Sequence, residues 1–253
     1  MNPVIGQVLT AHYSPWLVGL SFLASFAGSL VALWCAQRMV SRSGKTEFGM
    51  IACGAVALGG IGIWSMHFIG MQAYRLPVPI EYDVPLTALS LVAAILISGI
   101  ALYLAGARRQ FSKPGWAIGS LLAGAGVCVM HYMGMYAMNM RASMAFDTLT
   151  VALSIAIAGG AAGAALWPAF HVHRLSYQVA SAAVMGLAVC SMHYVGMSAA
   201  DMICTASAPH NGLAIGGAYI GLGVFGMAGL ALIFIFWVLT SDGEDMPGAT
   251  AAR

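Results

Sequence analysis

The feature that most constrains this chain is a series of seven long apolar stretches. They cover approximately residues 15–39, 48–73, 84–107, 115–138, 148–170, 176–200 and 213–239. Each stretch supplies the roughly 20 residues that a helix needs to cross a hydrocarbon layer about 30 Å thick. Only 7% of the residues are charged, whereas soluble domains contain about 25%. We therefore expect an all-α membrane protein: an N-terminal segment (1–14), a seven-helix membrane domain (15–240) and a disordered tail (241–253).

Basic residues are divided unevenly between the two ends of these helices. The loops after the first, third and fifth stretches contain seven of them: Arg38, Arg42, Lys45, Arg108, Arg109, Lys113 and Arg174. The opposite loops contain only Arg75 and Arg141. Because short cytoplasmic loops are enriched in Lys and Arg, we expect the N-terminus outside and the C-terminus in the cytoplasm. The basic residues then flank a lipid bilayer, and no nucleic-acid partner is expected.

A motif repeated three times organises the chain. It reads MHFIGM at residues 66–71, MHYMGM at 130–135 and MHYVGM at 192–197. Between successive histidines the chain crosses the membrane twice, so the repeats have the same topology. Parallel repeats of this kind are related by an axis along the membrane normal. The sequence therefore predicts three parallel two-helix units, with the last helix left over and all three motifs near the outer surface.

Each motif places its histidine and its second methionine on one helix face, because positions four residues apart are neighbours on an α-helix. The glycine three residues after each histidine removes a side chain from that face and allows a close approach by a neighbour. A further glycine stands seven residues before each histidine, at Gly60, Gly124 and Gly186. We expect these three glycines to tighten the packing of the helices.

Imidazole and thioether groups together favour copper, since thioether is a soft ligand and imidazole binds several transition metals. The candidate metal ligands are His67, His131, His193, Met71, Met135, Met197, Met66, Met130 and Met192. Weaker candidates are Cys128, Cys190, His12, Asp201 and Asn139. Three imidazole nitrogens on one ion lie within about 4 Å of one another, so we expect the three rings to face a common space. The alternative is structural: the histidines hydrogen-bond between helices and the methionines fill the core.

The three Met-His-aromatic-x-Gly-Met copies resemble the MHYT family of bacterial membrane sensors, from about His12 to Trp237. Ile69, Met133 and Val195 stand where the family motif has Thr. The resemblance implies a multi-pass protein of the bacterial inner membrane. It also implies that the Met and His residues of the motifs bind copper, and that the protein senses a diatomic gas such as oxygen, carbon monoxide or nitric oxide.

Three functions remain open from the sequence. The first is a copper-containing sensor of a gas or of redox state, which signals to a separate cytoplasmic protein or to a C-terminal output domain. The second is a copper-dependent membrane oxidoreductase, for which Asp201 and Glu81 are the only acid–base candidates. The third is a copper transporter, which requires ligands spread through the membrane depth. We favour the sensor, because the motif ligands cluster at one depth; whether the protein forms a homodimer is left open.

Overall fold

The computed structural model describes residues 4–41, 43–106, 112–172, 174–207 and 212–241. Its helices are α1 (Pro15–Ala36), α2 (Phe48–Ala55), the π-helix η1 (Val56–Ser65), α3 (Met66–Ala73), α4 (Val84–Gly106), α5 (Lys113–Tyr136), α6 (Thr148–His171), α7 (Leu175–Ser198) and α8 (Gly217–Ser241). Because α2, η1 and α3 form one continuous span, these helices make seven segments that are long and apolar enough to cross a membrane. The prediction of seven transmembrane helices is confirmed. Ser241, the first residue of the predicted disordered tail, ends α8, and the rest of that tail lies outside the described residues.

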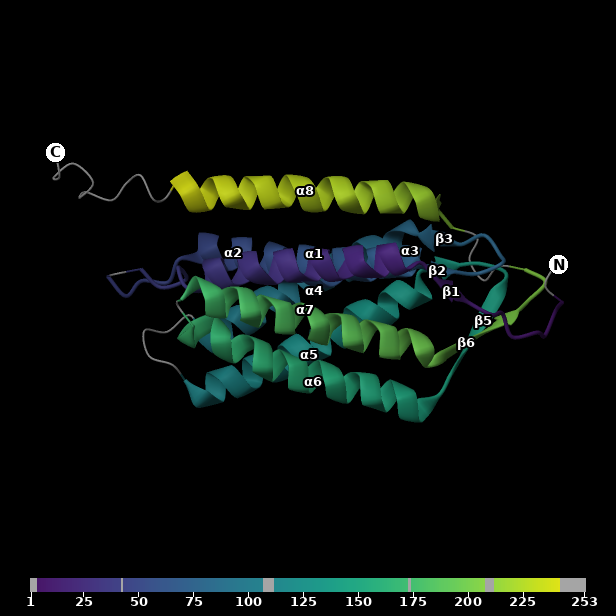
Figure 1. The fold of residues 1–253 in the computed structure, drawn as a ribbon, viewed down its shortest axis with the longest axis horizontal. Helices are drawn as coiled ribbons and strands as arrows, with labels where there is room; N and C mark the ends of the chain where they lie inside the picture. Colours follow the sequence, from purple (N-terminus) through teal and green to yellow (C-terminus); the bar gives the residue numbers. More distant parts are fainter. Residues whose placement is uncertain (1–3, 42, 107–111, 173, 208–211, 242–253) are drawn as a thin grey trace.

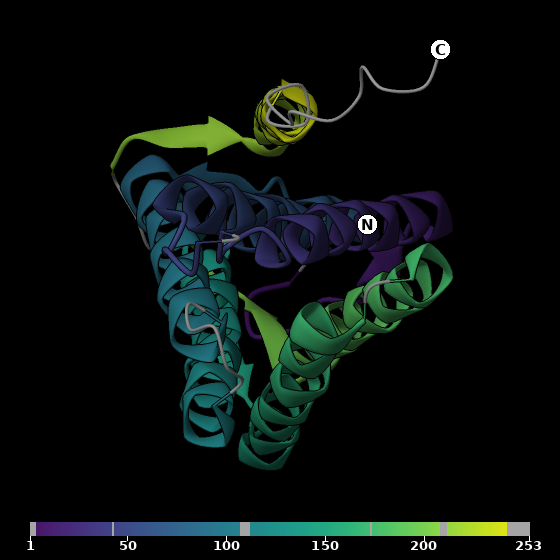
Figure 2. The ribbon, with the colours of Figure 1, turned by 90° about the vertical axis from the view of Figure 1, so that its left-hand side faces the viewer.

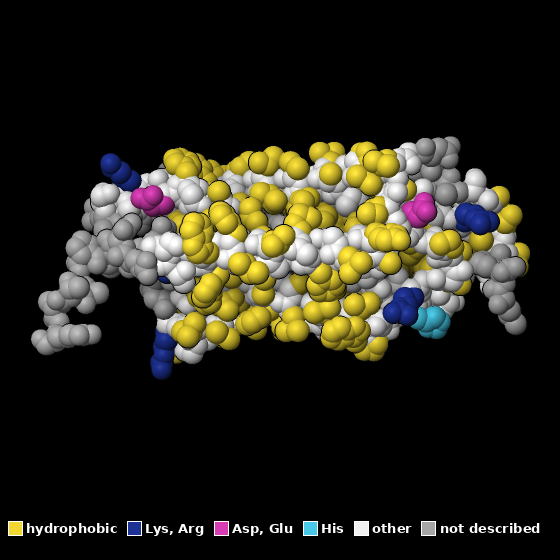
Figure 3. All heavy atoms as spheres, turned by 90° about the horizontal axis from the view of Figure 1, so that it is seen from above, with side chains coloured by type: hydrophobic (Ala, Val, Ile, Leu, Met, Phe, Trp, Pro, Cys, Tyr) yellow, Lys and Arg dark blue, Asp and Glu magenta, His cyan; other side chains and the backbone are white. Residues whose placement is uncertain are grey.

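The surface of the bundle is divided into bands, as a lipid bilayer requires. Figure 3 shows hydrophobic side chains over the middle of the molecule and charged side chains near its two ends. Large apolar side chains face outward, among them Leu222 and Leu230, which are 72% and 71% exposed. Such a surface is stable only against hydrocarbon.

Three helix pairs form the sides of a triangle when the bundle is viewed along its axis (Figure 2). The pairs are α1 with the α2–η1–α3 span, α4 with α5, and α6 with α7. Helix α8 stands outside this triangle and packs against η1 and α3. The prediction of three two-helix repeats and one additional helix is therefore confirmed.

Short strands cover one end of the bundle, which we call the strand end (Figure 1); the opposite end is the loop end. The strands are β1 (His12–Tyr13), β2 (Tyr74–Arg75), β3 (Glu81–Asp83), β4 (Met138–Asn139), β5 (Ala142–Phe146), β6 (Ala200–Cys204) and β7 (Ala214–Gly216). They form three antiparallel sheets: β1-β2, β4-β3-β7 and β5-β6. Where the chain leaves a helix, its backbone groups need new partners, and pairing between neighbouring connections supplies them. The predicted helix ends at residues 138, 200 and 213 were wrong for this reason.

In the second and third repeats, the first helix of the pair begins in the same way; we call this first helix of each pair, α1, α4 or α6, its outer helix. Asp83 accepts a hydrogen bond from the backbone N–H of Leu86 at 2.8 Å, next to the start of α4. Asp147 is the N-cap of α6 and accepts from the backbone N–H of Thr150 at 2.8 Å and from its hydroxyl at 2.6 Å. These hydrogen bonds from Thr150 hold the pKa of Asp147 below its usual value. A side-chain oxygen here satisfies a backbone donor that has no partner within the helix.

The π-helix η1 distinguishes the first repeat from the other two. In η1 the hydroxyl of Ser65 donates to the carbonyl of Gly60, five residues earlier. The packing glycine is shifted by one position: Gly59 contacts the backbone of Ala94 on α4, whereas Gly60 is only in ordinary contact with the side chain of Ile95. The expectation for Gly60 was wrong, because one residue per turn is added in a π-helix.

The equivalent glycines of the other repeats pack as predicted. A Cβ on Gly124 would lie 2.9 Å from the Cα of Gly159 on α6, and a Cβ on Gly186 would lie 3.2 Å from the backbone nitrogen of Phe26 on α1. Both distances require the neighbouring backbone to be very close. The expectation that these two glycines tighten the helix packing is confirmed.

The closest backbone contact of the first pair involves Gly28 of α1, and it generates a stability prediction. A Cβ at Gly28 would lie 2.6 Å from the Cα of Gly62 in η1. Gly28→Ala should lower the midpoint of thermal unfolding in detergent, because overpacking costs about 1–3 kcal/mol and exceeds the gain in helix propensity of up to about 1 kcal/mol. Gly19→Ala, on the same helix with no described atom within 4 Å of the added Cβ, should leave the midpoint unchanged or raise it. Equal midpoints for the two variants would contradict this packing.

Candidate metal centre

Three histidines meet on the axis of the triangle, one from each repeat. The Nδ1 atoms of His67 and His193 are 3.1 Å apart, those of His131 and His67 3.2 Å, and those of His193 and His131 3.3 Å. The rings are nearly perpendicular to one another, with interplanar angles of 87–89°. All three residues are at most 1% exposed. The expected common space therefore exists, and the atoms that face it are the Nδ1 nitrogens.

The motif glycines hold these rings in place. The Nε2 side of His67 lies against Gly134 of α5, that of His131 lies against Gly196 of α7, and that of His193 lies against Gly70 of α3. A Cβ at any of these glycines would collide with the imidazole, since it would lie 2.8–2.9 Å from the ring Cδ2. Each histidine is thus seated on the next repeat, and the three contacts close a ring around the axis.

Protons alone cannot satisfy the three Nδ1 atoms. A hydrogen bond joins a nitrogen that carries a proton to one that offers a lone pair, and a neutral imidazole nitrogen is one or the other. Around a ring of three nitrogens the two kinds cannot alternate, so at least one contact joins two donors or two lone pairs. A single cation in the centre removes this conflict, because it accepts all three lone pairs.

The Nε2 atoms add a second cost. Among the described residues, the Nε2 atoms of His67, His131 and His193 have no hydrogen-bond partner, and all three are buried. A buried polar group without a partner costs about 1–3 kcal/mol. The arrangement of imidazoles is therefore unfavourable on its own. A bound cation would remove the conflict among the Nδ1 atoms, whereas the Nε2 atoms would still lack a partner among the described residues.

The Nδ1 separations fit a metal ion. Three nitrogens bound at about 2.0 Å in tetrahedral geometry lie about 3.3 Å apart, and in planar geometry about 3.5 Å apart. The observed separations of 3.1–3.3 Å are close to these values, so the three Nδ1 atoms could hold one ion. Among the described His, Cys, Asp and Glu side chains, these three histidines form the only group of three or more whose ligand atoms could share an ion.

Aromatic side chains next to the histidines tie each motif helix to an outer helix. The hydroxyl of Tyr132 on α5 hydrogen-bonds to that of Ser154 on α6 at 2.7 Å. The hydroxyl of Tyr194 on α7 hydrogen-bonds to that of Ser21 on α1 at 2.9 Å, which joins the last motif helix to the first helix of the chain. The sequence analysis missed this role of the aromatic residue, although it recognised the position as part of the motif.

In the first repeat, different residues form the hydrogen bond between the motif helix and the outer helix. Its aromatic residue is Phe68, which has no hydroxyl group. Instead the indole N–H of Trp64, one turn earlier, donates to the hydroxyl of Ser90 on α4 at 3.0 Å. Trp64 stands where the other repeats have cysteine, so the substitution keeps the link between motif helix and outer helix.

The motif methionines are all buried in the core. Their exposed fractions are 0–1%: Met66, Met71, Met130, Met135, Met192 and Met197. The second methionine of each motif is one turn nearer the strand end than its histidine, and Met138 and Met140, at most 2% exposed, lie in the connection that follows the second motif. Buried thioether groups thus stand close to each histidine in the sequence, and the role of each methionine as a ligand stays a prediction.

The weaker candidates lie outside the group formed by the histidines. Cys190 lies close to Ser21 of α1, and Cys128 lies near Tyr132 of its own helix.

Three more weaker candidates lie in strands. His12 is exposed in β1, opposite Arg75, and Asn139 is buried in β4, opposite Glu81. Asp201 is exposed in β6. The pKa of the nearby Tyr74 is raised to about 12 by burial and by its neighbours Tyr13 and Asp201.

Comparison with known proteins agrees with the repeat. The MHYT family, described as a bacterial signalling protein N terminal repeat, matches residues 60–118 and 124–182. These ranges contain the first two motifs, and the third motif follows them.

Three curated relatives are longer than this chain. The bifunctional diguanylate cyclase/cyclic di-GMP phosphodiesterase MucR of Pseudomonas aeruginosa is 41% identical over 199 residues, which is 77% of this chain and 29% of that protein. The cyclic di-GMP phosphodiesterase NbdA of the same species is 34% identical over 82% of this chain and 27% of that protein. The signaling protein YkoW of Bacillus subtilis is 30% identical over 90% of this chain and 28% of that protein.

The chain spans less than a third of the length of these relatives. No solved structure matches it. The seven spans, the three motifs and these similarities together identify a multi-pass protein of the bacterial inner membrane. The chain belongs to the MHYT family of bacterial integral membrane sensors.

Proposed function

We propose that this chain is a membrane sensor module in which the three histidines bind one copper ion, and that it perceives a diatomic gas (oxygen, carbon monoxide or nitric oxide) or the redox state. The observation that carries the proposal is the set of three buried Nδ1 atoms, 3.1–3.3 Å apart, which a shared cation would satisfy.

The donor set favours copper among the transition metals. The described histidine group contains no carboxylate, which magnesium, calcium and manganese prefer. Each histidine is flanked in its motif by two buried methionines, and thioether ligands select Cu(I). When bound, copper supplies a one-electron couple and an acceptor for a small uncharged ligand. The protein supplies a buried site and three oriented imidazoles.

The contacts between the imidazole rings and the motif glycines suggest how ligand binding or a redox change at the copper centre moves the surrounding helices. Because each imidazole rests on a glycine of the next repeat, a ring cannot shift without moving a neighbouring helix. Helix α8 packs against α3 and η1, and its last turn receives a hydrogen bond of 2.7 Å from Arg38 to the carbonyl of Leu239. We propose that a movement of the motif helices changes this contact at the loop end.

The relatives support a role in signalling. The names of two of them describe cyclic di-GMP enzymes, and each is more than three times as long as the part that this chain matches. We propose that the output of this membrane module lies in a C-terminal domain or in a separate cytoplasmic signalling protein.

Neither alternative function has comparable support. An oxidoreductase needs acid–base groups beside the metal, and Asp201 and Glu81 are exposed in strands at the strand end. A transporter needs ligands along the depth of the membrane, and the histidine group lies at one level.

The first prediction concerns metal content. Purified protein should contain about one copper per chain by elemental analysis, and the triple variant His67→Ala, His131→Ala, His193→Ala should contain little. His12→Ala, which removes an exposed histidine of the strand end, should keep the metal. Equal copper in the wild type and the triple variant would refute the centre, whereas iron or zinc in its place would refute copper alone.

The second prediction concerns the contacts between the motif glycines and the histidine rings. Gly134→Ala should displace the ring of His67, because the new Cβ would collide with it. Copper affinity should fall roughly 10–100-fold, the range for losing a group that orients a metal-binding histidine. Gly160→Ala on α6, with no described atom within 4 Å of the added Cβ, should bind copper as the wild type does. Unchanged affinity in Gly134→Ala would show that the metal is held elsewhere.

The third prediction concerns orientation. We infer that the strand end faces outward, because the connections at the loop end contain seven basic residues and those at the strand end contain two, Arg75 and Arg141. A membrane-impermeant maleimide should label Glu81→Cys in intact cells, and Lys45→Cys only after permeabilisation. Unsubstituted protein gives the background from the native cysteines. The reverse labelling pattern would invert the topology.

A further inference from the structure

An apolar cavity lies directly beneath the histidine triad. It is lined by residues of η1, α5, α6 and α7 and has a volume of about 40 Å³. Three of its lining residues are Ile63, Val127 and Val189, each of which stands four residues before a motif histidine. One helical turn rises about 5.4 Å, so this ring of branched side chains is the next layer below the imidazoles. The cavity therefore reaches the layer of side chains next to the proposed centre, and residues of α6 complete its wall.

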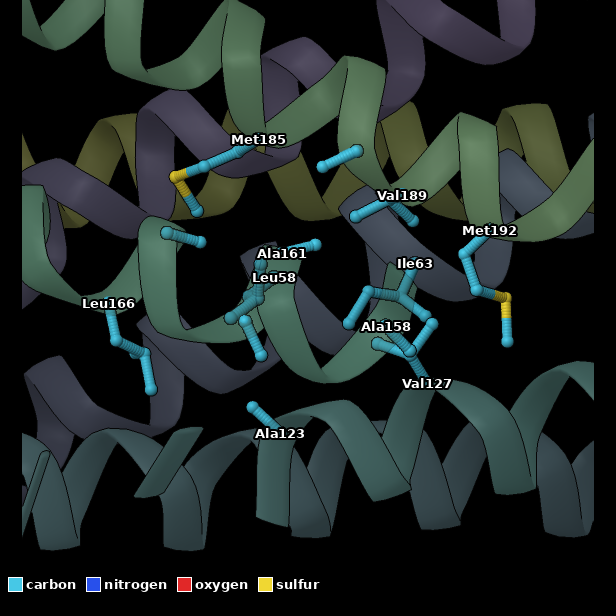
Figure 4. A pocket seen from close by; sticks show the side chains of 13 residues that line it. Leu58, Ile63, Ala123, Val127, Ala158, Ala161, Leu166, Met185, Val189 and Met192 are labelled. Carbon is cyan, nitrogen blue, oxygen red and sulfur yellow. The ribbon is translucent and has the colours of Figure 1, made fainter. Parts of the chain in front are cut away.

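The side chains in Figure 4 show how the cavity is arranged. Ile63, Val127 and Val189 lie toward the same end as Met192, the residue that directly precedes His193. Leu166 and Met185 lie toward the other end. The cavity thus extends from the layer below the triad into the middle of the bundle.

The lining makes the cavity unsuitable for water. All of its lining residues are Ala, Val, Leu, Ile or Met, and a buried water needs two to four polar partners. A volume of about 40 Å³ exceeds the roughly 10–15 Å³ that one water-sized probe occupies. Apolar cavities that exclude water bind small apolar molecules such as xenon. The surrounding bilayer dissolves such molecules better than water does.

We propose that this cavity is a binding site for one small uncharged apolar molecule, of the size of a dissolved diatomic gas, directly below the three imidazoles. Its connection to signalling rests on the proposed copper centre, whereas binding in the cavity does not depend on a metal. The site would raise the local concentration of an apolar ligand on the side of the triad that faces away from the strands.

Xenon is the probe, because it is apolar and does not coordinate copper. Protein labelled with ¹³C at the methionine methyl groups is placed in lipid nanodiscs and studied by NMR at increasing xenon pressure. The signals of Met185 and Met192, which line the cavity, should shift and then saturate. The signal of Met227, which is 45% exposed on α8, reports xenon dissolved in lipid and should change only in proportion to pressure.

Cavity-filling variants complete the test. Ala162→Leu, at a buried lining position of α6, should abolish the saturable shifts, and Ala161→Val, a smaller change in the same wall, should weaken them. Ala156→Leu, at an exposed position of the same helix, should preserve them. Shifts that stay proportional to pressure at Met185 and Met192 in the wild type would overturn the proposal, as would saturation that both filling variants leave unchanged.

The two proposals fail in different ways. Saturable xenon binding by protein that takes up no copper would support the cavity site and refute the copper centre. Copper uptake without saturable xenon binding would refute the cavity site and leave the centre in place.

Discussion

The rest of this structure depends on three buried imidazoles that face one another. Their Nδ1 atoms lie within hydrogen-bonding distance of one another. Because they are three, an odd number, donors and acceptors cannot alternate around them. Burial in the bundle removes the water that would otherwise resolve the conflict. A fold that keeps such a group together must either bear its cost or recover it from a bound cation. The absence of a partner on each Nε2 atom among the described residues adds to the cost of burying these rings, and a cation at the Nδ1 atoms would not remove that part.

The scaffold around the triad is built from the same few contacts, used three times. A glycine of the next repeat receives each ring, and a hydrogen bond to a serine of an outer helix fixes each motif helix. The first repeat departs from this plan twice. It contains a π-helix just before its histidine, and it replaces the tyrosine hydroxyl with the indole N–H of Trp64. Both departures preserve the position of His67, which indicates that the geometry of the triad is the property the fold maintains.

The sequence predicted the parts of this structure that follow from simple physical limits. The thickness of a bilayer fixes the length of a span, so the seven helices could be located from hydropathy alone. The nearly equal spacing of the three motifs, 64 and 62 residues between histidines, implied an axis, and the axis implied that the histidines meet. The strands at the strand end were missed because segments of two to five residues carry too little pattern to be recognised. The π-helix was missed because nothing local in the sequence distinguishes its hydrogen bonds from those of an α-helix. The link between Ser21 and Tyr194 joins residues 173 positions apart, and it depends on how the bundle closes.

X-ray absorption spectroscopy of the copper-loaded protein tests the central claim most directly. One copper held by His67, His131 and His193 requires three nitrogen scatterers at about 2.0 Å, with the outer-shell scattering typical of imidazole rings. A first shell with fewer than three imidazole nitrogens, or one made of sulfur alone, would contradict the shared centre. The triad would then be a packing arrangement, and the chemistry of sensing would have to lie elsewhere in the chain.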